Sequence, residues 1–192
     1  MNKFIWEKKN ALDSEFCKKV IYKFERDLRK SSGVTIGGYN NEVKKSIDLG
    51  ISFLPDWKNE DNVFCKSLSD AIDEYKQYLK KNLSTCSLDY NLTDSGYQIQ
   101  RTIGGEGFYH WHHDFLHNNS NGSRIITFIW YLNTINGPGG ETEFIDETKI
   151  KPEEGKLIFF PATWTNFHRG VMPPKGYVKY LCTGWLHAWI CL

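Results

Sequence analysis

The second half of the chain changes from the 3.6-residue periodicity of helices to short segments with the two-residue alternation of β-strands. Glycine- and proline-containing turns separate these segments, at residues 104–105, 136–140 and 173–176. Many short strands joined by such turns predict a sandwich or jelly roll of two packed sheets. The predicted strands are residues 97–101, 108–114, 124–132, 141–145, 156–160, 165–169 and 177–186.

Two amphipathic helices are predicted in the first half of the chain. Apolar residues recur at helical spacing over residues 12–29 and again over residues 62–82. Asp13 or Ser14 can cap the free N–H groups at the start of the first helix. Residues 45–53 between the helices alternate weakly and predict a strand. Each helix has one apolar stripe, which indicates that both helices lie against the predicted sheet.

The length predicts a single domain over residues 1–192, and the strand pattern makes this domain mainly β. Within it, residues 1–95 form a helical scaffold with the first strands, and residues 96–189 form the β core. The net charge of +1 and the lack of a basic block argue against nucleic-acid and anionic-membrane partners. The five cysteines form no C-x-x-C pair, and no apolar segment resembles a signal peptide or membrane span. We therefore expect a reduced, cytoplasmic environment.

The most informative side chains lie in the predicted strand of residues 108–114. Residues i and i+2 of a strand project from one face, so His112 and Asp114 are expected to point into one cavity. A later strand can bring His168 opposite them. Two imidazoles and one carboxylate are the ligands of the facial triad that holds iron(II) in non-haem oxygenases. The spacing therefore predicts a metal-binding and catalytic set of His112, Asp114 and His168.

His110 leaves a second metal site open. It shares the predicted strand face with His112, so His110, His112 and His168 would form a three-imidazole zinc site with an open position for water. The protein would then be a zinc- or manganese-dependent barrel enzyme. His113 is expected to point away from this face and to have a structural role.

Lys179 favours the iron alternative. The predicted strand over residues 177–186 places Lys179 on one face with Leu181, Thr183 and Trp185. These neighbours enclose the lysine stem, and a buried ammonium requires a partner because an unpaired buried charge is very costly. A dicarboxylate bound to the metal would supply that partner. Tyr131 could add a phenolic hydrogen bond.

Five motifs follow one another in the order expected of a known enzyme family. They are a glycine-containing lead-in to Y-x-x-H-x-D at residues 101–114, a central strand at 124–133, a G-G-x-T-x-F hairpin at 139–144, a P-x-x-G-x-L-x-F-F-P strand at 151–161, and His168-Arg169-Gly170 followed by Lys179 and Trp185. Together, residues 97–187 resemble the catalytic core of prolyl 4-hydroxylase-type 2-oxoglutarate/iron(II) dioxygenases. Thr102 departs from the tyrosine common in that family, and the cosubstrate-binding base is Lys179 rather than arginine.

The resemblance implies a fold and a cofactor site. The fold would be a double-stranded β-helix, or jelly roll, with two supporting N-terminal helices. His112, Asp114 and His168 would hold Fe(II), and Lys179 and Tyr131 would bind the far carboxylate of 2-oxoglutarate. The resemblance further places Thr183, Trp185 and Tyr109 at the cosubstrate.

The resemblance also implies a reaction that consumes 2-oxoglutarate and O2, with ascorbate as reductant, and releases succinate and CO2. It would hydroxylate an unactivated C–H bond, by analogy in a prolyl residue of a peptide or protein. Arg169, Trp111 and Trp164 adjoin the predicted ligands and could contact this substrate, while loops 33–42 and 115–123 flank the mouth. The protein would act as a monomer or homodimer. The remaining alternative is a binding module that keeps the barrel without catalysis.

Overall fold

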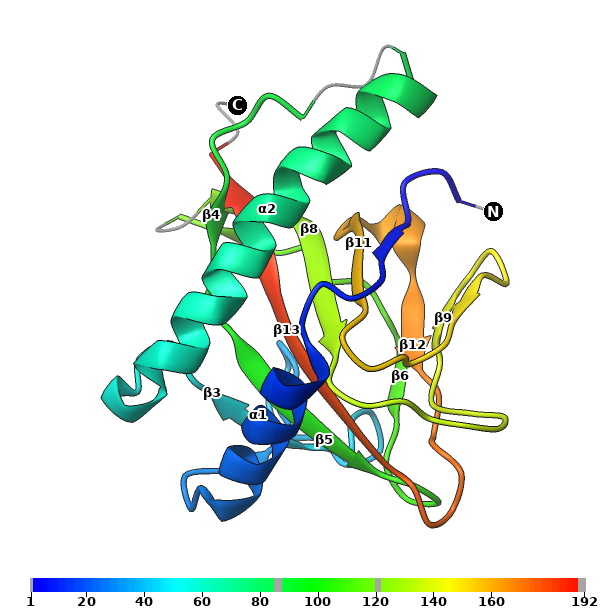
Figure 1. The fold of residues 1–192 in the computed structure, drawn as a ribbon. Coiled ribbons are helices and arrows are strands. Elements are labelled where there is room, and N and C mark those ends of the chain that lie inside the picture. The colour runs from blue at the N-terminus through cyan, green and yellow to red at the C-terminus, as the bar shows by residue number, and fades with distance from the viewer. Residues whose placement is uncertain (1, 85–87, 120–121, 190–192) are drawn as a thin grey trace.

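Two antiparallel β-sheets face each other, and two helices cover the outer side of the larger sheet (Figure 1). This computed structural model describes residues 2–84, 88–119 and 122–189. The mainly β jelly roll with two N-terminal helices that the sequence predicts is therefore confirmed. No helix in these described ranges is long and apolar enough to cross a membrane.

The larger sheet contains most of the strands. Its spatial order is β1 (Trp6–Lys8), β11 (Leu157–Pro161), β8 (Gly122–Tyr131), β13 (Val178–Ala188), β5 (Gln98–Ile103), β3 (Ile47–Gly50) and β2 (Ser31–Ser32). Two further strands pair with this sheet, β4 (Thr93–Asp94) with β13 and β7 (His117–Asn118) with β8. The smaller sheet has the order β10 (Lys149–Ile150), β9 (Thr142–Phe144), β12 (His168–Gly170) and β6 (Tyr109–His112).

The helices begin where polar side chains favour their ends. α1 (Ser14–Arg26) is capped by Asp13, whose carboxylate accepts a hydrogen bond of 2.7 Å from the Phe16 backbone N–H. α2 (Lys58–Asn82) follows the 3-10 turn η1 (Pro55–Trp57) directly and starts four residues before its predicted beginning. Its first turn carries acidic residues, which suit the positive end of the helix dipole but add nothing to an apolar periodicity.

Alternation along β8 divides the interior into two apolar layers. Phe128 and Trp130 point toward the helices, where they pack with Phe64 of α2 in the larger hydrophobic cluster. Ile129 and Tyr131 point between the sheets into the smaller cluster. These apolar side chains fill the space between the sheets at one end of β8. What can bind between the sheets at the other end of β8 depends on the side chains there.

Two strands that adjoin the predicted metal site are shorter than expected. β6 ends at His112, and Asp114 lies beyond it with its N–H donating to the carbonyl of Ala162 at 3.1 Å. β12 begins only at His168, because the 3-10 turn η2 (Trp164–Asn166) occupies the residues before it. β1 was not predicted, since three residues are too few to show an alternation.

Candidate metal centre and cosubstrate pocket

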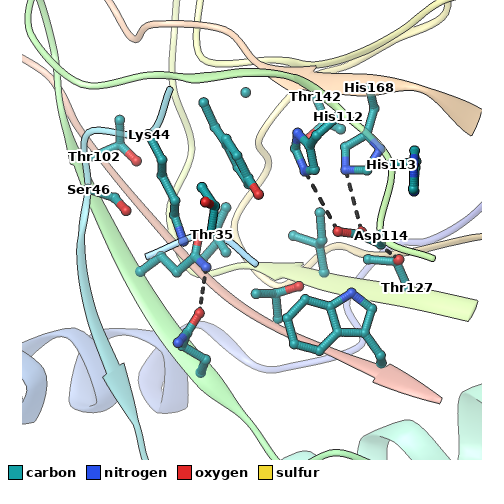
Figure 2. Close-up of a pocket in the computed structure, with 18 of the residues that line it drawn as sticks. Thr35, Lys44, Ser46, Thr102, His112, His113, Asp114, Thr127, Thr142 and His168 are labelled. Atoms are coloured by element: carbon teal, nitrogen blue, oxygen red, sulfur yellow. Dashed lines mark hydrogen bonds and ion pairs between the residues drawn. The ribbon is translucent and has the colours of Figure 1, made fainter. Parts of the chain in front are cut away.

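The structure brings His112, Asp114 and His168 together. One potential ligand atom of each lies within 4.8 Å of the others, and no other such group of three occurs in the described residues. His112 Nε2 is 3.7 Å from Asp114 Oδ1, and His168 Nε2 is 3.5 Å from Asp114 Oδ2. The two histidines are direct cross-strand neighbours of β6 and β12. Figure 2 shows both imidazoles converging on the carboxylate.

Backbone carbonyls fix the tautomer of both imidazoles. The Nδ1 atom of His112 lies 2.7 Å from the carbonyl oxygen of His110, and that of His168 lies 3.0 Å from the carbonyl oxygen of Asn166. A carbonyl only accepts hydrogen bonds, so each Nδ1 carries the proton and each Nε2 presents a lone pair to the centre of the cluster. Metal-binding histidines are oriented in this way.

The charge of the cluster suits a divalent cation. Burial and the neighbouring His168 lower the pKa of His112 to about 3, so this ring is neutral at physiological pH. Burial alone would raise the pKa of Asp114, but the two histidines and the Thr127 hydroxyl, which donates at 2.7 Å, outweigh it and lower that pKa. Two imidazoles and one carboxylate are a donor set that fits a divalent transition metal.

His110 does not belong to the cluster, which corrects the prediction that it shares a face with His112. Its side chain is exposed, and its ring packs against Phe108 at 5.0 Å. His168 pairs with His112, and Gly170 pairs with Tyr109. Two residues along β12 therefore lie opposite three residues along β6. This β-bulge interrupts the alternation on β6. The structure therefore gives no support to a three-imidazole site.

A pocket of about 420 Å³ adjoins the cluster. Its walls include the whole predicted face of β13, namely Lys179, Leu181, Thr183 and Trp185. The opposite wall includes Tyr109, whose ring stacks on His112 with centroids 3.6 Å apart. His113 also lines the pocket, and its ring contacts Phe167 edge-on.

Lys179 holds a buried positive charge in this pocket. Its side chain is only 3% exposed, and Nζ donates to the carbonyl of Gly140 at 2.9 Å. Among the described residues, no carboxylate lies within ion-pair distance of Nζ. Burial lowers the pKa of Lys179 to about 8. The pocket thus contains an ammonium group that an anionic ligand can pair with.

Tyr131 lies behind the pocket wall. Its hydroxyl donates to Thr142 Oγ1 at 2.7 Å, and Thr142 rather than Tyr131 lines the pocket. Thr183 lines the pocket, although its hydroxyl donates to the backbone carbonyl of Phe128 at 2.8 Å. A direct contact of Tyr131 with a ligand remains a prediction. Of these two hydroxyl groups, that of Thr142 belongs to a residue that lines the pocket.

The three predicted substrate residues are not in the pocket wall. Arg169 pairs with Glu143 at 2.6 Å and lies 4.9 Å above the ring of Trp111. Trp164 is 63% exposed and contacts Phe115. The predicted mouth loops do line the pocket, through Val34, Thr35, Ile36 and Leu116.

Arg124 is a pocket residue that the sequence reasoning missed. Its guanidinium lies 3.6 Å over the ring of Trp185, and its Nη1 donates to the backbone carbonyl of Asp114 at 3.5 Å. Its buried Nε has no hydrogen-bond partner among the described residues. Leu186 pairs with Ile126, and the next residue, His187, pairs with Arg124. One residue along β13 therefore lies opposite two residues along β8. This bulge turns Arg124 to the same side as Thr127, which simple alternation would not predict.

Comparison with known proteins gives a family for this site. Residues 97–187 match the sequence model of the 2OG-Fe(II) oxygenase superfamily. These residues belong to this superfamily. The match includes all three residues of the buried cluster and also Lys179. Membership in the 2OG-Fe(II) oxygenases implies Fe(II), 2-oxoglutarate and O2 as cofactor and cosubstrates. No curated protein matches the sequence significantly.

Solved structures of prolyl hydroxylases share the fold. A viral collagen prolyl hydroxylase from Paramecium bursaria Chlorella virus-1, in complex with 2OG, aligns over 98% of each chain with 22% identity and a TM-score of 0.68. A Trichoplax adhaerens prolyl hydroxylase bound to a fragment of hypoxia inducible factor aligns over 97% of this chain and 84% of its own, with 18% identity and a TM-score of 0.72. A Pseudomonas putida prolyl-4-hydroxylase aligns over 96% and 92%, with 16% identity and a TM-score of 0.67.

Proposed function

We propose that this 2OG-Fe(II) oxygenase hydroxylates an unactivated C–H bond of a prolyl residue in a peptide or protein. The observation that carries the proposal is the cluster of His112, Asp114 and His168 at a pocket that also contains the buried ammonium of Lys179. The three cluster residues would hold Fe(II). Bound iron, with 2-oxoglutarate and O2, supplies the oxidising chemistry that yields succinate and CO2, and ascorbate would serve as reductant.

The chain itself would bind and orient the cosubstrate. Lys179 would pair with the far carboxylate of 2-oxoglutarate, and Thr142, supported by Tyr131, offers a hydroxyl close to it. Leu181 and Ile129 would cover the aliphatic part of the cosubstrate and exclude water. Tyr109, Thr183 and Trp185 would complete this part of the site.

The pKa of Lys179 predicts how 2-oxoglutarate affinity depends on pH. Below about pH 8 the side chain is already the ammonium that a carboxylate needs. Above that value the free protein must take up a proton to bind, so affinity should fall as the pH rises, by about tenfold per unit. Calorimetric titration of the iron-loaded protein without oxygen measures the 2-oxoglutarate affinity at pH 7 and pH 9. The same titration in buffers of different ionisation enthalpy measures the proton uptake on binding. Equal affinity at both values would contradict this role of Lys179.

A prolyl substrate is proposed by analogy with the three structural neighbours, each of which is a prolyl hydroxylase. Proline-rich peptides and cell lysate should be incubated with protein, Fe(II), ascorbate and 2-oxoglutarate, and then examined by mass spectrometry. We expect a product peptide that carries one additional oxygen atom on a prolyl residue. Oxygen added only to other residues would keep the oxygenase and reject the prolyl substrate.

Arg124 is proposed to contact the substrate, since it is a pocket cation with no carboxylate in ion-pair distance among the described residues. Replacing Arg124 with methionine should raise the KM for peptide by about tenfold or more, the usual loss when a charged hydrogen bond is removed. The KM for 2-oxoglutarate should stay close to that of the wild type. An unchanged peptide KM would contradict this contact.

We further propose that residues 1–192 work as one cytoplasmic unit, as a monomer or homodimer, with residues 1–95 supporting the catalytic core in residues 96–189. Metal analysis of protein purified without oxygen tests the zinc- or manganese-dependent alternative. A binding module would fail to decarboxylate 2-oxoglutarate under any condition.

A further inference from the structure

A buried ion pair lies in the pocket region, apart from the candidate metal ligands. Lys44 Nζ is 2.7 Å from Asp48 Oδ2, and the two side chains are only 4% and 5% exposed. The Ser46 hydroxyl donates to the other carboxylate oxygen of Asp48 at 2.8 Å. Gly33 packs against the pair so closely that a Cβ there would lie 2.9 Å from Lys44 Cε and 2.3 Å from Ser46 Oγ. Nothing in the proposed chemistry uses this pair, yet a buried ion pair is costly to build.

The pair joins the two sheets at one edge of the pocket. Residues 43–45 extend the smaller sheet, because Lys45 N–H donates to the Phe108 carbonyl at 2.9 Å and His110 N–H donates to the Val43 carbonyl at 2.8 Å. Asp48 belongs to β3 of the larger sheet. The ion pair therefore fixes the chain where it crosses from one sheet to the other.

Lys44 also lies close to the support of His112. Its backbone pairs with Tyr109, and its Nζ lies 5.2 Å from the centroid of the Tyr109 ring. The Tyr109 ring in turn stacks on His112, with the ring planes 18° apart. The carbonyl that orients His112 Nδ1 belongs to His110, whose N–H is bonded to residue 43. Figure 2 shows Lys44 and His112 in the same pocket.

We infer that Lys44 and Asp48 are positioning residues for His112. The pair holds residues 43–45 against β6, and this contact keeps Tyr109 stacked on the imidazole and the His110 carbonyl on Nδ1. Loss of the pair would free the ring to rotate, so that Nε2 no longer converges with Asp114 and His168. This inference rests on the proposed function, because it assigns the pair to the iron site.

The test compares Lys44→Met with a matched control. Lys45→Met removes a lysine of the same segment whose pair with Glu106 is long, at 3.6 Å, and about half exposed. Calorimetric titration of metal-free protein with Ni(II) should show K44M binding about 10-fold or more weakly, as when the support of a metal ligand is lost. K45M should stay within about twofold of the wild type, because exposed pairs contribute little. Lys44→Arg, which keeps the pair, should recover most of the affinity.

A second readout reports on the ring itself. Stacking on Tyr109 shifts the His112 ring protons upfield in the NMR spectrum of the metal-free protein, and K44M should reverse that shift while K45M keeps it. Wild-type Ni(II) affinity, or an unchanged His112 shift, in folded K44M would overturn the inference. If circular dichroism shows that K44M is unfolded, Tyr109→Leu is used instead, because it removes the ring that stacks on His112. Wild-type Ni(II) affinity of that variant would also overturn the inference. Failure of the wild-type protein to bind Ni(II) would instead contradict the proposed function, and the proton shifts would still decide whether Lys44 positions His112.

Discussion

Replacing His112 with alanine is expected to reduce succinate formation from 2-oxoglutarate to the level of metal-free protein. The variant leaves one imidazole and one carboxylate, and the Nε2 that converges with them is gone. Two ligands in a pocket open to water do not hold iron(II) in a defined geometry. Succinate release with Fe(II), ascorbate and 2-oxoglutarate measures the effect, with iron content determined on the same sample.

His110→Ala is the matched control, since it removes an imidazole from the same strand that lies outside the cluster. Its turnover should remain near that of the wild type. Substantial succinate formation by the His112 variant would count heavily against the assignment. Loss of activity in the His110 variant, with its fold intact, would revive the three-imidazole alternative.

Replacing Lys179 with methionine is expected to weaken 2-oxoglutarate binding by about 100-fold or more, the usual cost of leaving a buried carboxylate without its partner. The same change should make the ligand-free protein more stable to heat. Burial holds the pKa of Lys179 below its ordinary value, so the ammonium destabilises the folded state at neutral pH. Titration with 2-oxoglutarate and thermal unfolding of the same variant measure the two effects.

Lys175→Met provides the comparison, because Lys175 is an exposed lysine in the turn just before β13. It should change neither quantity appreciably. A Lys179 variant that unfolds at higher temperature yet binds 2-oxoglutarate normally would show that the ammonium is buried without holding the cosubstrate.

Regular alternation explains the parts of the site that could be predicted. β13 has no irregularity between Lys179 and Trp185, so the four side chains expected on one face all line the pocket. The turn residues and the apolar stripes likewise placed the strands and helices to within a few residues. These periodic patterns follow from the backbone geometry of a strand or a helix, so they can be recognised from residues that are close together in the sequence.

The features of the site that the sequence does not reveal depend on long-range contacts. Bulges in β6 and β8 exclude His110 from the cluster and turn Arg124 toward the pocket, and each exists only because two distant strands pair unevenly. The hydroxyl of Tyr131 is directed by Thr142, its neighbour across the interior. Lys44 comes from the first half of the chain, where nothing in the sequence signals proximity to Tyr109.

We propose above that His112, Asp114 and His168 bind iron(II) and that Lys179 pairs with the 2-oxoglutarate bound beside it. The most direct measurement is the absorption spectrum of the protein under anaerobic conditions, with Fe(II) alone, with 2-oxoglutarate alone and with both. A new absorbance is expected only when both are present, and it should be lost in the His112→Ala variant. No 2-oxoglutarate-dependent absorbance, in folded protein that retains zinc instead of binding iron, would contradict it.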